Sequence, residues 1–432
     1  MRATAREAPV PGAVEPLRPG DLTMLATDVG PVPMNIAAVL LVAGGDDGTA
    51  DVPEAVVARA ATVPRLVQML RRPRRGAAQW VVDAGADPAR HLACRHLAGG
   101  GERAVLDEAA RLLSTTLDPS HPLWTALRLT GWDVSGARRG ALVVVCHHVL
   151  ADGIGGLGVL AALADDEPTA PAAPHPPAAP PPSGPRAWWA GLRELGLGAR
   201  LPRRAARTSL NRPTGPDRSV AALGVPLAAF HAGAHRLGGT VNDAVVATVV
   251  GALTALLADR GEHPGALVVS VPVTGRAAGD RRAGNDNGVL PVQVPTGPDL
   301  GGRVRHVAAA TARRKAGPRG HSSLPLGGAF RALSRAGAFR AFLERQRLVH
   351  TFETNMRGPA ARMRVAGREV VAVVPAAANP GNVAASFAVL SYAGELVVAV
   401  VTDPEVVPDA GELAGHLAAE LAAVAGVPVR VW

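Results

Sequence analysis

A chain of 432 residues is too long for one ordinary hydrophobic core, so we expect two domains. Hydrophobic residues make up 48% of the chain, which excludes an intrinsically disordered protein. The net charge of +9 favours an anionic partner, although the near-exclusive use of arginine (Lys315 is the only lysine) also fits GC-rich codon usage. Because only 3% of residues are aromatic, stacking surfaces are scarce and we expect no nucleic-acid partner.

Cysteine usage and hydropathy bear on the compartment. Cys94 and Cys146 provide no disulfide framework, which is typical of a reducing, cytoplasmic environment. Residues 1–22 lack the apolar core of a signal peptide. The longest apolar run, residues 244–258, is too short to span a bilayer and follows two polar residues. We therefore expect a cytoplasmic protein whose most apolar helix is buried.

In the first half of the chain, segments of helical and strand periodicity alternate. The pattern predicts helices at 21–28, 53–70, 102–117 and 155–163, and strands at 34–43, 79–82, 125–129 and 140–148. Half of residues 168–185 are proline, which favours an extended spacer over any packed element. We place the domain boundary there, with domains at 1–167 and 186–432.

The second half repeats the alternation. Helices are predicted at 227–237, 241–257, 301–314 and 411–425, and strands at 220–225, 267–273, 288–294, 370–374, 387–392 and 396–402. Phe339, Phe342, Leu343 and Gln346 form one stripe of a further helix, and arginines lie off it. Such a stripe usually faces the core; the alternative is contact with a membrane surface.

The most informative stretch is a buried strand that ends in two histidines. The β-branched run 143–145 leads into His147 and His148, and Asp152-Gly153 follows as a turn in which the glycine can take positive φ. Imidazole titrates near neutral pH, so it can take a proton from a hydroxyl that attacks a carbonyl. Neighbouring residues of a strand point to opposite sides, so only one of the two histidines can face a given site.

The residues from His147 to Gly153 resemble the HHxxxDG signature of CoA-dependent acyltransferases and peptide-synthetase condensation domains. They are most similar to the bacterial wax ester synthase/diacylglycerol acyltransferase family. Further motifs occur in that family's order along nearly the whole chain: Pro122-Leu123-Trp124, Asn242-Asp243, Gly284-Asn285, Thr354-Asn355 with Gly358-Pro359, Leu390-Ser391-Tyr392-Ala393-Gly394 and Thr402-Asp403. Met356-Arg357 stands where the family has Val-Pro.

The resemblance implies an α/β fold of two chloramphenicol-acetyltransferase-like domains, each a mixed sheet with helices, and an active-site tunnel between them. It implies transfer of a fatty acyl group from acyl-CoA, as co-substrate, to diacylglycerol or a long-chain alcohol without a cofactor or metal. By the family pattern His148 is the base, His147 supports it, and Asp152 holds the turn through an arginine. Backbone N–H groups near residues 153–156 are candidate oxyanion donors. Association with a membrane or lipid-droplet surface is also implied.

Several alternatives stay open at this stage. Cys146 is either a buried hydrophobe or a nucleophile paired with His148. Asn242-Asp243 either caps a helix or shapes the site, and the basic residues 313–315 either bind CoA phosphates or are solvated. A metal site is disfavoured because neighbouring strand histidines diverge. The acceptor is alternatively a hydroxyl or amine of a specialised metabolite, or the chain is a catalytically silent acyl-CoA- or lipid-binding protein.

Overall fold

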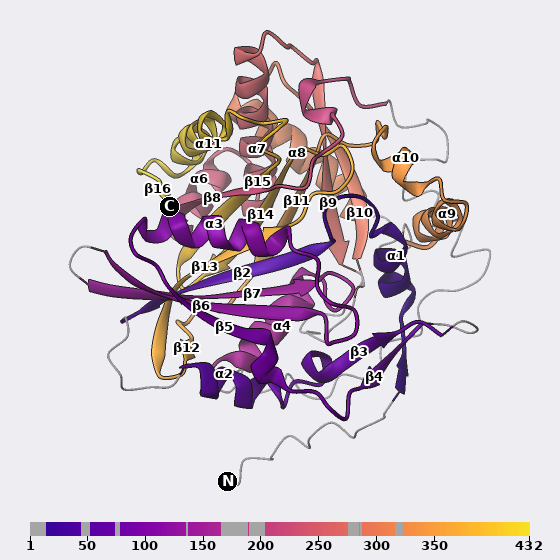
Figure 1. The fold of residues 1–432 in the computed structure, drawn as a ribbon. Helices are drawn as coiled ribbons and strands as arrows, with labels where there is room; N and C mark the ends of the chain where they lie inside the picture. Colours follow the sequence, from indigo (N-terminus) through magenta and orange to yellow (C-terminus); the bar gives the residue numbers. More distant parts are fainter. Residues whose placement is uncertain are drawn as a thin grey trace.

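The computed structural model describes residues 14–44, 52–73, 78–134, 137–165, 189, 204–274, 285, 287–315 and 323–432. Two large sheets with helices around them make up most of the molecule, and a small third sheet lies at one edge (Figure 1). The predicted proline-rich boundary at 168–185 lies outside the described residues.

The first sheet has six strands and carries the histidine motif. Its order is β12-β13-β2-β7-β6-β5, and the strands are β2 (Asn35–Ala43), β5 (Leu92–His96), β6 (Trp124–Val134), β7 (Ala137–His147), β12 (Arg364–Val365) and β13 (Arg368–Ala377). The central strand β7 pairs antiparallel with β2 on one side and β6 on the other. The histidines therefore end a strand that is held along both edges.

Helices cover both faces of this sheet, as the alternation of side chains along β2 requires. Leu41 packs with α3 (Gly101–Leu113) on one face. Leu40 packs on the opposite face, in a cluster with α2 (Val52–Ala60) and α4 (Gly153–Leu163). Neighbouring residues of a strand point to opposite sides, so a strand covered on both faces is apolar throughout.

The second sheet has seven strands in the order β10-β9-β11-β14-β15-β8-β16. They are β8 (Ser219–Pro226), β9 (Ala266–Thr274), β10 (Asn287–Pro295), β11 (Thr351–Arg357), β14 (Ala385–Tyr392), β15 (Glu395–Thr402) and β16 (Arg430–Val431). Strand β11 runs parallel to both of its neighbours, and the other pairs are antiparallel. Each of the two large sheets is thus mixed, because β5 in the first also pairs in parallel.

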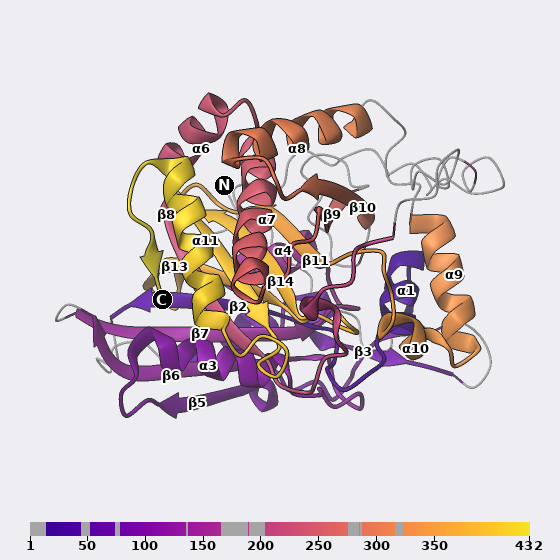
Figure 2. The ribbon, with the colours of Figure 1, turned by 90° about the horizontal axis from the view of Figure 1, so that it is seen from above.

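One face of the second sheet is covered by four helices: α6 (Leu227–Arg236), α7 (Val241–Asp259), α8 (Leu300–Lys315) and α11 (Ala410–Ala425) (Figure 2). Helix α7 is apolar on all sides. Its length and hydropathy would suffice to cross a bilayer, yet 72% of that stretch is buried inside the protein. A helix that is hydrophobic all round and enclosed by other elements is a core helix.

The two halves of the chain are interleaved. Strands β12 and β13 come from the C-terminal half, yet β13 pairs with β2 over residues 370–377. The residues 1–167 assigned to the first domain therefore do not complete its sheet by themselves. On the face of this sheet that α3 covers, Val39 packs with Val220 and Val397 of the second sheet in one continuous cluster.

Two helices distant in sequence lie side by side at one edge of the molecule. These are α1 (Pro19–Thr27) and α9 (Ser323–Arg335), with the short α10 (Phe339–Leu343) next to α9 (Figures 1 and 2). The third sheet, β1 (Val14–Pro16), β4 (Gln79–Val82) and β3 (Gln68–Arg71), lies nearby.

Some predicted elements are wrong in length or missing. The helix predicted at 53–70 ends at Ala60, because Pro64 biases the preceding residue away from helix and starts a 3-10 turn that leads into β3. The helix predicted to run to residue 117 ends at Leu113. The striped segment around Phe339 forms only the five residues of α10, and Phe339 faces inward against Phe330 and Phe342.

Candidate active site

The end of β7 is positioned from both sides. The backbone N–H of His147 donates to the carbonyl of Leu123 at 3.0 Å, and that of His148 donates to the carbonyl of Met34 at 2.6 Å. The N–H of Leu150 then donates to the carbonyl of His147 at 2.9 Å and closes the turn. The backbone N–H groups of both histidines are therefore hydrogen-bonded, which fixes the positions from which the two imidazoles project.

Both ring nitrogens of His147 are occupied by the protein. Nδ1 accepts from the N–H of Val149 at 3.1 Å, so Nε2 carries the proton that it donates to Asp28 Oδ2 at 3.0 Å. Burial alone would raise the pKa of Asp28, but the hydrogen bonds from His147 and from the N–H of Met34 hold it below its ordinary value. His147 is 6% exposed and is placed to support the strand end.

His148 points the other way and meets the second half of the chain. Its Nδ1 lies 2.9 Å from Oδ1 of Asn285, and Nε2 has no hydrogen-bond partner among the described residues. Burial lowers the pKa of His148 from its ordinary value, although a hydrogen bond to the backbone of His148 itself, the field of Asp152 and the bond to Asn285 oppose that shift. The residue is partly exposed. Because burial lowers its pKa, His148 is a neutral imidazole at pH 7, and among the described residues Nε2 is its nitrogen without a hydrogen-bond partner.

Asp152 caps the helix that follows the motif. Its Oδ1 accepts from the N–H of Gly155 at 2.8 Å, its carbonyl accepts from the N–H of Gly156 at 2.7 Å, and its side chain is fully buried. Two of the amides expected as oxyanion donors are thus already engaged in the helix cap. The contact between Asp152 and an arginine, which the resemblance implies, stays a prediction.

Gly153 is needed for close packing and not for a positive φ, the reason that the sequence suggests. Its φ is not positive. A Cβ at this position would lie 2.6 Å from Sδ of Met356 and 3.7 Å from Cγ2 of Thr354, both on β11. The glycine thus permits close approach of α4 to the second sheet, at the point where this chain departs from the family's Val-Pro.

The Pro122-Leu123-Trp124 segment packs behind the histidines. Leu123 supplies the carbonyl that accepts from His147, and the indole N–H of Trp124 donates to the carbonyl of Leu66 at 2.9 Å. His91 stacks on the indole with ring centroids 4.6 Å apart. These residues hold the motif in place, and the buried Trp124 contributes apolar packing to the core.

Asn242-Asp243 lies at the start of α7, and its aspartate caps that helix. Asp243 Oδ2 accepts from the N–H of Thr240 at 2.9 Å, and Thr240 Oγ1 accepts in turn from the N–H of Asp243. Oδ1 of Asp243 accepts from Thr311 on α8 at 2.8 Å. The contacts of Asp243 are therefore those of a helix cap, the structural alternative for this motif.

The cysteine alternative does not fit the site. Cys146 is buried, and burial raises its pKa to about 12, so that the thiol stays protonated. Among the described residues, no group of three His, Cys, Asp or Glu side chains is arranged to hold a metal ion.

Sequence reasoning missed the polar residues that hold the two histidines. Asp28 carries no motif signal, and its role depends on contact with a residue 119 positions away. Asn285 belongs to the Gly284-Asn285 motif, but nothing in that motif indicates a bond to His148. A contact between residues 137 positions apart is not encoded in local periodicity.

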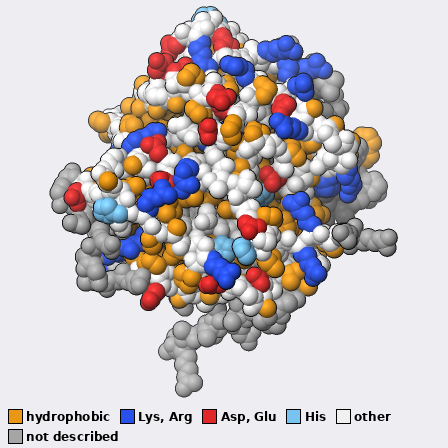
Figure 3. Space-filling view, in the orientation of Figure 1, with side chains coloured by type: hydrophobic (Ala, Val, Ile, Leu, Met, Phe, Trp, Pro, Cys, Tyr) orange, Lys and Arg blue, Asp and Glu red, His pale blue; other side chains and the backbone are white. Residues whose placement is uncertain are grey.

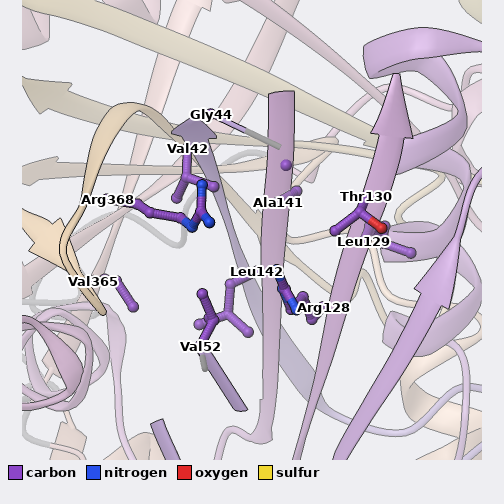
Figure 4. Close-up of a pocket in the computed structure, with 11 residues that line it drawn as sticks. Val42, Gly44, Val52, Arg128, Leu129, Thr130, Ala141, Leu142, Val365 and Arg368 are labelled. Carbon is purple, nitrogen blue, oxygen red and sulfur yellow. The ribbon is translucent and has the colours of Figure 1, made fainter. Parts of the chain in front are cut away.

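Two pockets among the described residues are not lined by His148. The one in Figure 4 includes Arg128 of β6 and Arg368 of β13 and surrounds residues 140–142, roughly 16 Å along β7 from His147 at 3.3 Å per residue. Another lies beside α4, lined by Leu160, Tyr392 and Arg357. The tunnel to His148 stays a prediction.

Comparison with known proteins agrees with this architecture. The family model for the wax ester synthase/diacylglycerol acyltransferase catalytic domain matches residues 17–196, and that for the C-terminal domain of the same family matches residues 283–425. A probable diacylglycerol O-acyltransferase of Mycobacterium tuberculosis is 28% identical over 395 residues, which cover 82% of this chain and 83% of that protein. A putative diacylglycerol O-acyltransferase of the same species is 29% identical over 386 residues, covering 79% and 80%.

Solved structures show the same fold. The wax ester synthase/diacylglycerol acyltransferase from Marinobacter aquaeolei superposes with a TM-score of 0.71 at 22% identity, covering 95% of this chain and all of that one. The first condensation domain of the calcium-dependent antibiotic synthetase gives 0.67 at 18% identity, covering 97% and 99%. The predicted architecture of two mixed-sheet domains is confirmed, and the chain belongs to the wax ester synthase/diacylglycerol acyltransferase family.

Proposed function

We propose that this protein transfers a fatty acyl group from acyl-CoA to the hydroxyl of diacylglycerol or of a long-chain alcohol, producing triacylglycerol or a wax ester. Membership of the family and the names of its relatives support acyl transfer of this kind. The observation that carries the proposal for this chain is the partly exposed, neutral His148 at the end of β7, whose Nε2 has no hydrogen-bond partner in the part of the chain that the structure describes.

In the proposed reaction, His148 acts as general base. It takes the proton of the acceptor hydroxyl as that oxygen attacks the thioester carbon, which avoids a free alkoxide at neutral pH. The tetrahedral intermediate then collapses: the carbon–sulfur bond breaks, and the imidazolium returns its proton to the departing CoA thiolate. The products are an ester and CoA, the base is regenerated, and neither a covalent acyl-enzyme nor a redox step is needed.

Release of free CoA tests this proposal. Purified protein with palmitoyl-CoA and either hexadecanol or diacylglycerol should release CoA and form the ester. His148→Ala should lower kcat by roughly 10²–10⁴, the range of general-base contributions. His231→Ala, at an exposed position of α6, is the matched control and should keep the wild-type rate. Equal rates for His148→Ala and wild type would exclude His148 as the base.

The acceptor is defined by a panel in the same assay. Long-chain alcohols, diacylglycerol, short alcohols and amines are compared at fixed palmitoyl-CoA, and then the acyl chain length is varied. Preference for a small amine or hydroxyl would replace the lipid acceptor in the proposal. Tight binding of acyl-CoA without turnover of any acceptor would support a catalytically silent binding protein instead.

We place the enzyme in the cytoplasm, in peripheral contact with the membrane or lipid-droplet surfaces that hold such acceptors. The buried α7 is unsuited as an anchor. Basic side chains are spread over the face in Figure 3 with acidic side chains among them. Among the described residues, the apolar side chain of Leu348 is 47% exposed. Co-flotation with anionic vesicles but not with neutral ones, lost at high salt, is the expected result; absence of any flotation would contradict surface contact.

A further inference from the structure

The strongest unexplained feature of the site is a polar bridge from the histidine to the first helix of the chain. Asn285 contacts His148 through its side-chain oxygen and Asp21 of α1 through its side-chain nitrogen. All three residues lie far apart in sequence, and Asn285 is 6% and Asp21 1% exposed. We infer that Asn285, held in place by Asp21, is a positioning residue that fixes the protonation state of each ring nitrogen in His148; this rests on the proposed function.

The orientation of the Asn285 amide follows from its neighbours. Its Nδ2 lies 2.8 Å from the carbonyl of His148, 3.3 Å from the carbonyl of Val149 and 3.0 Å from Asp21 Oδ1. All three are acceptors, so the group facing them must be the NH₂. The opposite orientation would set an oxygen against three oxygens. Oδ1 is therefore the atom that faces His148.

That orientation determines the tautomer. An amide oxygen only accepts, so Nδ1 of His148 must carry the hydrogen that it donates. A neutral imidazole has one N–H, and Nε2 is consequently left with a lone pair. Nε2 is also the nitrogen without a partner among the described residues. The bridge thus presents the base in the form that can accept a proton, without waiting for the ring to change tautomer.

Helix α1 is built to hold this bridge. Asp21 Oδ2 accepts from the N–H of Arg18 at the helix start, while Oδ1 accepts from both the backbone N–H and Nδ2 of Asn285, at 2.8 and 3.0 Å. The preceding residue is a glycine against which the Asn285 backbone packs. A Cβ on Gly20 would lie 2.1 Å from the Asn285 carbonyl oxygen, so any larger residue displaces the bridge.

The direct test is the tautomer of His148 in the full-length protein. Nitrogen-15 NMR of histidine-labelled protein distinguishes Nδ1–H from Nε2–H, and the His148→Ala spectrum identifies the signal. Wild type should show Nδ1–H at His148. Asn285→Ala should weaken that preference, and Gly20→Ala should weaken it less. Thr23→Ala, a partly exposed neighbour on α1, should leave it intact. An Nε2–H tautomer in wild type overturns the inference.

Kinetics separate positioning from mere support of the fold. Asn285→Ala should lower kcat on the order of 10- to 10³-fold with little change in KM, because a wrong tautomer disables the base and not substrate binding. Asn285→Ala also removes a hydrogen bond that raises the pKa of His148, so the acid limb of its kcat/KM profile should shift to lower pH. Asn285→Ala with a lower Tm but wild-type tautomer and pH profile would reduce Asn285 to a structural role.

The two proposals fail differently. The NMR measurement does not need turnover, so an inactive wild type with Nδ1–H at His148 would refute the acyl transfer and leave the bridge standing. An active wild type with Nε2–H would refute the bridge alone.

Discussion

Glu353 is a fully buried acidic residue of the second sheet, and none of the contacts described above for the histidine site involves it. It lies on β11, opposite Phe387 of β14, and its side chain is fully buried. Among the described residues neither carboxyl oxygen has a hydrogen-bond partner. Burial raises the pKa of Glu353 from its ordinary 4.5 to about 8, so the folded protein holds it protonated at neutral pH.

Stability should therefore fall as pH rises through the window between these values. The unfolded chain releases the proton near pH 4.5 and the folded protein only near pH 8, so folding must keep a proton that the unfolded state gives up. Glu353→Gln removes this linkage. We expect the gain in free energy of unfolding of the variant over wild type to be larger at pH 8 than at pH 5 by about 3 to 4 kcal/mol.

Urea denaturation at both pH values measures this difference. Glu412→Gln, at an exposed position of α11, is the matched control and should change stability equally little at both. The same gain for Glu353→Gln at pH 5 and pH 8 would show that packing, and not titration, is responsible.

A buried ion pair joins two segments next to the second sheet. Asp403, from the Thr402-Asp403 motif at the end of β15, accepts from the N–H of Gly215 at 2.6 Å and pairs with Arg218 at 3.4 Å, both side chains being fully buried. Burial lowers the pKa of Arg218 to about 10, which leaves it charged at neutral pH. This motif joins the loops that flank β8 and β15, and its contacts are structural.

The contact between α6 and α11 depends on Gly233. A Cβ there would lie 1.7 Å from the carbonyl oxygen of Val424, which is backbone and cannot move aside. Gly233→Ala should lower the free energy of unfolding by about 2 kcal/mol or more, because it separates two packed helices. Gly415→Ala, on the exposed face of α11 with open space around it, should be neutral or stabilising by up to about 1 kcal/mol. Thermal unfolding of both variants makes the comparison, and equal Tm values would contradict it.

At the scale of the whole molecule, the halves depend on each other. Strand β13 crosses from the second half to pair with β2, and the cluster around Val39 and Val220 joins the faces of the two sheets. The histidine site has the same character, since His148 comes from one half and Asn285 from the other. We retain the division at 168–185 as a proposal about the chain's linker and not about independent folding.

Fragments test that dependence. Residues 1–185 alone should be insoluble or unfolded, because the edge of β2 lacks β13 and the apolar cluster around Val39 loses its second-sheet members, such as Val220. Co-expression with residues 186–432 should restore a soluble complex that co-purifies and releases CoA. A fragment 1–185 that unfolds cooperatively on its own would contradict the interleaved fold.

Local patterns were sufficient for much of this protein. Apolar runs with strand or helix periodicity predicted β7, β15 and α7 to within a few residues, because each is buried among apolar neighbours over most of its length. Strand β11 was not predicted, because its polar residues from Thr351 to Asn355 break the apolar pattern. The order of the motifs along the chain indicates the family and points to His148.

Tertiary structure alone decided how His148 is held. The bonds to Asn285 and, beyond it, to Asp21 join residues 137 and 264 positions apart, and no periodicity or spacing encodes such contacts. The same holds for the transfer of β13 into the first sheet and for the engagement of Gly155 and Gly156 by Asp152. Sequence determines which groups the chain carries and which segments are buried; only the packed chain determines which buried polar groups satisfy one another, because each must find a partner that folding brings near.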